Sequence, residues 1–142
     1  MDLTSVALTS ARGRIAFGLL ATALPSVVTR MMLAEPRADG TAPFVRMFGV
    51  RDAALGLGAV VAIDQGTPVR GWFEAMAMAD AGDALTAVLD RRHLTPNAFR
   101  VTLGLAGGSA LVHLLLGRRL DPHPPAHLHQ PEAVATGHPE PA

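Results

Sequence analysis

The sequence contains no cysteine among its 142 residues. That absence excludes disulfide bonds, a thiolate nucleophile and any cysteine-ligated metal centre. Lysine is also missing, so all 12 fixed positive charges are arginines, and 12 acidic residues balance them to a net charge of zero. Nucleic-acid-binding domains carry a basic surplus on one face. The charge balance therefore excludes nucleic acid as an expected partner.

Aromatic and charged residues are both scarce. Tyrosine is absent, a single tryptophan is present, and aromatic residues make up 4% of the chain. Charged residues make up 17%, against about 25% in a typical soluble domain. The hydrophobic share of 49% comes mostly from alanine, leucine and valine, and 14 glycines accompany them. Small residues at this density are typical of closely packed helices, especially within a membrane.

Known catalytic signatures are absent as well. The sequence has no G-x-S-x-G element, no Walker loop and no H-E-x-x-H pair. The stretch "DAGDAL" at 80–85 is similar to part of the motif of membrane transferases that join a nucleotide-linked lipid to an alcohol. That motif needs further spaced aspartates and a Gly-Arg pair, which this chain lacks. We therefore predict no catalytic residue, no metal site and no cofactor, and an enzyme is the less favoured interpretation.

Four apolar segments of helical length follow one another, and no alternating pattern indicates strands. They predict helices at 13–34, 44–63, 69–90 and 98–117. Short polar connections between them favour antiparallel neighbours. We predict an all-α protein in which residues 1–119 form a compact bundle of four antiparallel transmembrane helices. Residues 120–142 are rich in proline and histidine, and this composition predicts a disordered tail.

The membrane interpretation depends on the least charged segments. No charge lies between Arg14 and Arg30, and residues 101–117 carry no fixed charge and span roughly 25 Å as a helix. A soluble bundle needs a polar face on every helix, and these segments have almost none. We therefore expect a multi-pass protein of the cell membrane with membrane lipids as partners. Arginines are spread almost evenly over the two sides, and we expect both termini in the cytoplasm.

Charges inside the second and third segments predict a polar core cluster of Arg51, Asp52, Asp80 and Asp83. An antiparallel hairpin with its turn near residues 65 and 66 places Arg51 opposite Asp80, with Asp83 within reach. Charged groups inside a bilayer face the bundle interior and pair with one another. The planar guanidinium of arginine is able to serve two carboxylates.

Asp52 needs a separate partner, because adjacent positions on a helix point about 100° apart. Arg46, Arg100 and His113 are candidate partners, and protonation of Asp52 is another solution. Glu74 and His113 are possible secondary polar residues of the same core.

Two interpretations of the cluster remain open. In the first, it is a clamp that fixes which helix faces which, in an accessory or interaction subunit that forms homo-oligomers or joins a larger membrane complex. Gly104 and Gly108 have the spacing that permits close helix contact. In the alternative, the protein is a membrane enzyme or small carrier that uses the cluster as a proton, ion or polar-ligand site.

A family resemblance supports the same architecture. The stretches "GRIAFGLLATALP", "RMFGVRDAALGLG" and "ADAGDAL", followed by a fourth helix that ends in arginine, resemble small four-helix membrane proteins common in actinobacteria. These include the DUF4267-like group of unknown function. The resemblance covers roughly residues 10–120 and implies an integral membrane protein. It implies no activity, substrate or catalytic residue.

Overall fold

The structure is a computed structural model that describes residues 2–33 and 40–120, and within these ranges every regular element is helical. The prediction of an all-α fold is confirmed. The elements are α1 (Leu3–Ala23), α2 (Pro25–Leu33), α3 (Thr41–Asp64), α4 (Arg70–Leu89), a single 3-10 turn η1 (Arg91–His93) and α5 (Pro96–Leu120).

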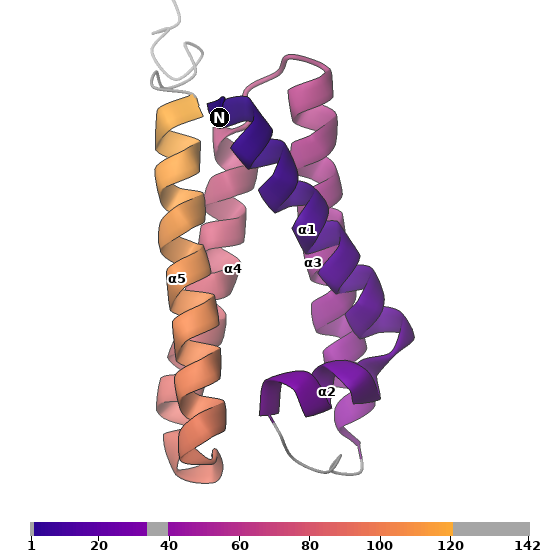
Figure 1. The fold of residues 1–142 in the computed structure, drawn as a ribbon, viewed down its shortest axis with the longest axis vertical. Helices are drawn as coiled ribbons and strands as arrows, with labels where there is room; N and C mark the ends of the chain where they lie inside the picture. The colour runs from indigo at the N-terminus through magenta and orange to yellow at the C-terminus, as the bar shows by residue number, and fades with distance from the viewer. Residues whose placement is uncertain (1, 34–39, 121–142) are drawn as a thin grey trace, which may run out of the picture.

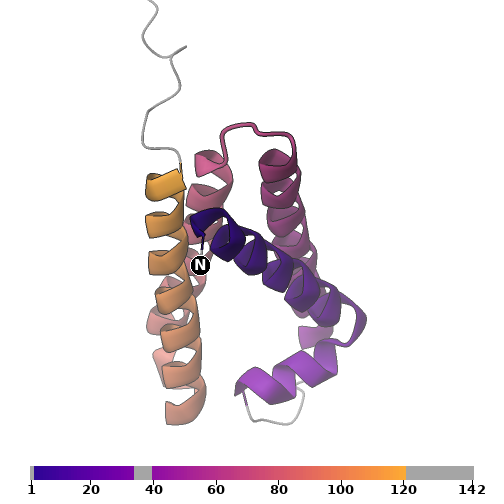
Figure 2. The same cartoon turned by 45° about the horizontal axis from the view of Figure 1, so that its top comes forward.

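The four long helices form two closely packed pairs. Helix α1 packs along α3, and α4 packs along α5. In Figures 1 and 2 the pairs converge at the end where α1 begins and α5 ends, and they diverge toward the opposite end. The short helix α2 crosses that opposite end. The pairs thus meet at one end of the bundle, and at the other end α2 contacts both α3 and α5.

The first predicted helix differs from the observed one at both ends. We predicted a single helix at 13–34, whereas α1 begins ten residues earlier, at Leu3, and ends at Ala23. Leu24 leaves the helical conformation, and α2 begins at Pro25. Proline has no backbone N–H and its ring clashes with the preceding turn, so it is tolerated at the start of a helix and breaks one elsewhere. Pro25 therefore divides this segment into two helices.

Glycine permits the close contact between α1 and α3. A Cβ atom added to Gly18 would lie 2.5 Å from the backbone oxygen of Gly49 and 2.5 Å from the backbone nitrogen of Ala53. One added to Gly56 would lie 2.6 Å from the backbone oxygen of Ala11. Because these contacts are with backbone atoms, the two helices approach as closely as small-residue interfaces in membranes do.

The apolar core is small and occupies the end where the pairs meet. Phe73 and Met76 of α4 are its largest fully buried side chains. They pack with alanines of α1 and α3 and with Leu116 of α5. The core is therefore built from alanines of α1 and α3 and from Leu116 of α5 around two large side chains of α4.

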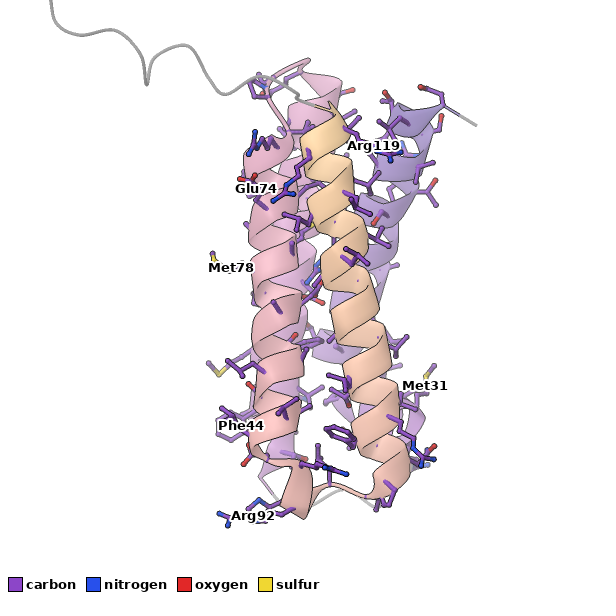
Figure 3. The ribbon with its side chains drawn as sticks, turned by 90° about the vertical axis from the view of Figure 1, so that its left-hand side faces the viewer. Met31, Phe44, Glu74, Met78, Arg92 and Arg119 are labelled. Atoms are coloured by element: carbon purple, nitrogen blue, oxygen red, sulfur yellow. The ribbon has the colours of Figure 1, made fainter. Side chains whose placement is uncertain are left out.

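Large apolar side chains lie mostly on the outside. Met78 is 74% exposed, Phe44 73% and Met31 71%. Figure 3 shows these three side chains pointing away from the helices, with Glu74 and Arg119 near one end of the molecule and Arg92 at the other. Among the described residues, the buried positions are mainly alanines, glycines and a few charged groups, which is the reverse of a typical soluble protein;.

One described helix, α5, is long and apolar enough to cross a membrane when judged by length and composition alone. The other long helices carry the charges described below. The predicted tail at 120–142 lies outside the described residues except for Leu120, which ends α5.

Candidate functional site

Arg14 of α1 is buried and joins the two helix pairs. It occupies the buried face of α1, where Ala7, Ala11 and Gly18 recur at helical spacing;. These neighbours are small, so the long side chain extends between the helices to α4. Its guanidinium donates two hydrogen bonds to Asp80, from Nη1 to Oδ2 at 2.9 Å and from Nη2 to Oδ1 at 2.6 Å.

Asp52 of α3 is bound by two arginines. Its Oδ1 accepts hydrogen bonds from Arg14 Nη2 at 2.9 Å and from Arg51 Nη2 at 3.2 Å. Within the described part of the chain, its second oxygen, Oδ2, accepts no hydrogen bond. Asp52 is only 4% exposed. A buried carboxylate therefore retains one free acceptor.

Arg51 and Asp83 form a second pair between α3 and α4. Arg51 Nη1 donates to Asp83 Oδ1 at 3.1 Å, and Nη2 donates to Oδ2 at 2.7 Å. The guanidinium also lies 4.7 Å from the ring centroid of Phe48, within cation–π range;. This pair is less buried than that of Arg14, because the Arg51 and Asp83 side chains are 37% and 27% exposed.

His113 brings α5 into the same network. Its Nδ1 lies 2.9 Å from Asp80 Oδ2, and its Nε2 lies 2.9 Å from Ser10 Oγ of α1. Ser109, one turn earlier on α5, donates to Asp80 Oδ2 at 2.8 Å. A neutral imidazole with its proton on Nδ1 satisfies both ring contacts, since Nδ1 then donates to Asp80 and Nε2 accepts from Ser10. All four long helices thus contribute polar atoms to one cluster.

The cluster is slightly acidic and almost fully satisfied. Two guanidinium groups face three carboxylates, which leaves one negative charge in excess among these five groups. Within the described residues, Arg14 Nε is the one fully buried side-chain nitrogen or oxygen without a hydrogen-bond partner. Buried ions are costly unless paired and hydrogen-bonded. The dense pairing therefore allows these charges to be buried.

A cavity of about 450 Å³ lies beside the network and is lined by all five α-helices. Its polar lining includes Arg14, Asp52, Asp80, Asp83 and His113, and its apolar lining includes Phe17, Val28, Phe48 and Leu105. A second cavity of about 370 Å³ shares Val28, Phe48, Asp83 and Thr102 with the first and extends to Leu94 beyond α4. Together they form one cleft between the diverging helix pairs, polar at mid-helix and apolar along most of its length.

Comparison with protein-family models, with curated proteins and with solved structures finds no match. The DUF4267-like resemblance therefore stays a prediction. Any function proposed for the chain is supported by its own geometry.

The structure brings Arg51, Asp52, Asp80 and Asp83 together as the sequence suggested, but with other pairings. Asp80, predicted opposite Arg51, is bound by Arg14, and Arg51 binds Asp83, which the sequence predicts within its reach. Helix α3 is therefore offset along α4 by about one turn from the assumed register. The main partner of Asp52 is none of the three candidates named from the sequence.

The sequence does not predict a role for Arg14, because the helix predicted at 13–34 places this residue at its beginning. The observed α1 extends eleven residues before it. The sequence signal that identifies it is the run of small residues at Ala7, Ala11, Gly18 and Ala21, in which Arg14 takes one position of a buried stripe;.

Of the two residues predicted as secondary polar members of the core, His113 and Glu74, only one joins the cluster. His113 belongs to the cluster, bonded to Asp80 and Ser10. Glu74 does not belong to it, because it pairs with Arg70 one turn away on α4, near the end of the molecule. In the described ranges, no group of three or more histidines or acidic residues has the geometry to hold a metal ion.

Proposed function

We propose that this chain is a small multi-pass integral membrane protein that acts as an accessory or interaction subunit without chemistry of its own. One observation carries the proposal: large apolar side chains lie outside, and small or charged ones lie inside. Met78, Phe44 and Met31 are exposed, whereas Arg14 and Asp80 are buried. Soluble monomers rarely expose extended apolar surfaces, and lipid would cover this one.

The charged residues of α1, α3 and α4 are compatible with four spans. A charged residue facing lipid is costly, but Arg14, Asp52 and Asp80 are ion-paired with one another within the bundle. Intramembrane charges that face the interior and pair in this way are tolerated. Arg92 lies at one end of the molecule and Arg119 at the other, as a transmembrane orientation of the bundle requires, whereas Arg12 is exposed near the middle of α1.

In this proposal the polar cluster is a clamp. Helix pairs α1–α3 and α4–α5 share little apolar contact beyond the end where they meet. Arg14, bonded to both Asp52 and Asp80, connects the two pairs at mid-helix. Interhelical hydrogen bonds contribute to helix association in membranes, because lipid tails are as apolar as the side chains and the hydrophobic effect does not drive the helices together. The cluster would therefore fix the relative position of the pairs.

The interaction surface in this proposal is the outward face of α5. A Cβ atom added to Gly104 or Gly108 would meet nothing within 4 Å, so this G-x-x-x-G spacing faces open space. Such a spacing allows a second helix to approach closely. A second copy of the chain, or a helix of a larger membrane complex, would pack there.

Membrane fractionation after an alkaline carbonate wash tests the proposal. Retention in the membrane pellet is expected, and release into the supernatant would exclude an integral membrane protein. The clamp is tested by Asp80→Asn, which should lower the yield of folded, monodisperse protein. Asp90→Asn, at an exposed position beyond α4, is the matched control and should leave that yield unchanged.

A second candidate function is a membrane carrier or enzyme that uses the cluster as a proton, ion or polar-ligand site. The cavity beside Arg14, Asp52, Asp80 and His113 favours it, because a clamp alone needs no adjacent space. A normal yield of folded Asp80→Asn protein together with a lost phenotype would favour this candidate over the clamp.

A further inference from the structure

We infer that the cleft between the helix pairs is a binding site for a cationic amphiphile, a long-chain primary amine whose ammonium group binds Asp52. This inference rests on the proposed membrane location and goes beyond the clamp.

The proposed position of the ligand's head group is set by an oxygen of Asp52 that accepts no hydrogen bond from the described residues. Asp52 Oδ1 is bound by Arg14 and Arg51, while Oδ2 accepts no hydrogen bond from any described residue. The residue is more than nine-tenths buried and lines the cavity. Oδ2 is not among the fully enclosed polar atoms of the described residues, so a donor from outside the protein is able to reach it. The position therefore calls for a hydrogen-bond donor from the ligand.

The charge of the head group follows from the charge of the site. Between them, two guanidiniums and three carboxylates carry one negative charge in excess. Electrostatic interactions are strong away from water, so one added positive charge would balance the cluster. An anionic head group would meet three carboxylates on the cavity wall, Asp52, Asp80 and Asp83. A single ammonium satisfies both the charge and the free acceptor.

The apolar residues that line the cavity indicate that the rest of the ligand is apolar. Phe17, Val28, Phe48 and Leu105 line the cavity around the cluster. The volume of about 450 Å³ lies within the usual range of ligand sites, about 300–1,000 Å³;. The cleft continues past Phe48 to Leu94, which gives an alkyl chain an apolar path along the helices.

Entry from the membrane is consistent with the residues at the rim. Met31 of α2 and Leu105 of α5 line the cavity and are also 71% and 58% exposed. An amphiphile dissolved in the bilayer would meet apolar side chains at this opening before it reaches the charged residues of the cluster. The site thus favours ligands that partition into lipid over polar metabolites in water.

Photolabelling of the full-length protein in lipid nanodiscs tests the inference. The probe is a dodecylamine with a diazirine in its chain, and its dodecanol and dodecanoic acid analogues are comparison probes. We expect the amine to label the peptides that contain Phe17 and Leu105 about tenfold more than either analogue does, since one charged hydrogen bond is worth that factor. Equal labelling by the alcohol or the acid would overturn the cationic head group.

Gly13→Leu blocks the site without removing a hydrogen bond. Gly13 lines the cavity, and a Cβ atom there would meet nothing within 4 Å. The variant should reduce amine labelling about tenfold, and Ala106→Leu on the opposite wall should do the same if Gly13→Leu fails to fold;. Gly82→Leu is the matched control, because Gly82 is equally open but lies on the exposed face of α4, away from both cavities.

Asp52→Asn tests the head-group contact in correctly folded protein. It should reduce labelling by the amine to the level of the alcohol. Retained labelling in Asp52→Asn or in Gly13→Leu would overturn the site. Carbonate extraction separates the two proposals: released protein contradicts the membrane location, whereas protein that is retained but labelled only on outward-facing peptides contradicts the amine site alone.

Discussion

Arg14 of α1 and Asp80 of α4, which are 66 residues apart in the sequence, form a bidentate ion pair in which both side chains are at least nine-tenths buried. Both nitrogens at the end of the guanidinium are used, and Nη2 also reaches Asp52. This pair is the more buried of the two bidentate ion pairs that link the helix pairs, the other being Arg51 with Asp83. Its geometry makes Arg14, rather than Arg51, the residue on which the cluster depends.

Arg14→Met should strongly destabilise the protein. Methionine fills similar space but leaves Asp80 and Asp52 buried without the cation that binds them, and breaking a buried pair in this way costs about 3–5 kcal/mol. The free energy of unfolding, measured by denaturant titration in mixed micelles, should fall by that amount. Arg12→Met is the matched control on the same helix, because Arg12 is exposed. Equal stability of the two variants would contradict the central role of Arg14.

The two ion pairs should differ in coupling energy. Arg51 and Asp83 are partly exposed, at 37% and 27% of their side-chain area, and exposed pairs contribute about 0–1 kcal/mol. A double-mutant cycle with Arg51→Gln and Asp83→Asn should therefore give at most about 1 kcal/mol. The corresponding cycle with Arg14→Gln and Asp80→Asn should give a clearly larger value. Equal coupling energies would show that burial does not decide the strength of these pairs.

Gly49→Ala should separate α1 from α3. The added methyl carbon would lie 2.5 Å from the backbone oxygen of Gly18 and 2.6 Å from Thr22 Oγ1, so the helices must move apart. Overpacking of this kind costs about 1–3 kcal/mol, which unfolding in micelles measures.

The control for this variant is Gly82→Ala. A Cβ atom there meets nothing within 4 Å, and alanine favours the helix over glycine by roughly 0.5–1 kcal/mol. The control should therefore be neutral or slightly stabilising. A Gly49→Ala protein as stable as the Gly82→Ala protein would contradict the close contact between the helices.

The sequence predicts the helices better than it predicts their pairing. Long apolar segments and polar turns are local signals, and they place α3, α4 and α5 close to their observed bounds. The division at Pro25 is also local, although whether a proline bends or ends a helix depends on what the next segment packs against. Here α2 crosses the end of the bundle where the helix pairs diverge.

The pairing of charges depends on helix register, which the sequence specifies poorly. A shift of one turn moves Arg51 from Asp80 to Asp83, because these carboxylates lie three residues apart on the same face of α4. The Arg14 contacts depend on α1 meeting α4 and α5 across the bundle. Ser10 and Ser109 enter the cluster through the same packing. No local pattern specifies such contacts before the bundle is assembled.

The absence of cysteine provides a direct test of the four spans, since a single introduced cysteine is unique. Gln65, Met78 and Arg92 are all exposed in the isolated chain: Gln65 lies between α3 and α4, Met78 at mid-α4 and Arg92 in the 3-10 turn. A soluble protein would react with a membrane-impermeant maleimide at all three positions. A four-span protein with both termini in the cytoplasm should not.

We expect Arg92→Cys to react in intact cells, Gln65→Cys to react only after permeabilisation, and Met78→Cys to react only after solubilisation in denaturant. The reason is that Gln65 lies at the end of the molecule where α1 begins and α5 ends, while Arg92 lies at the opposite end. Reaction of Gln65→Cys instead of Arg92→Cys in intact cells would reverse the orientation and keep the spans. Reaction of Met78→Cys in native membranes would contradict the lipid-facing surface itself, because its 74% exposed side chain would then face water.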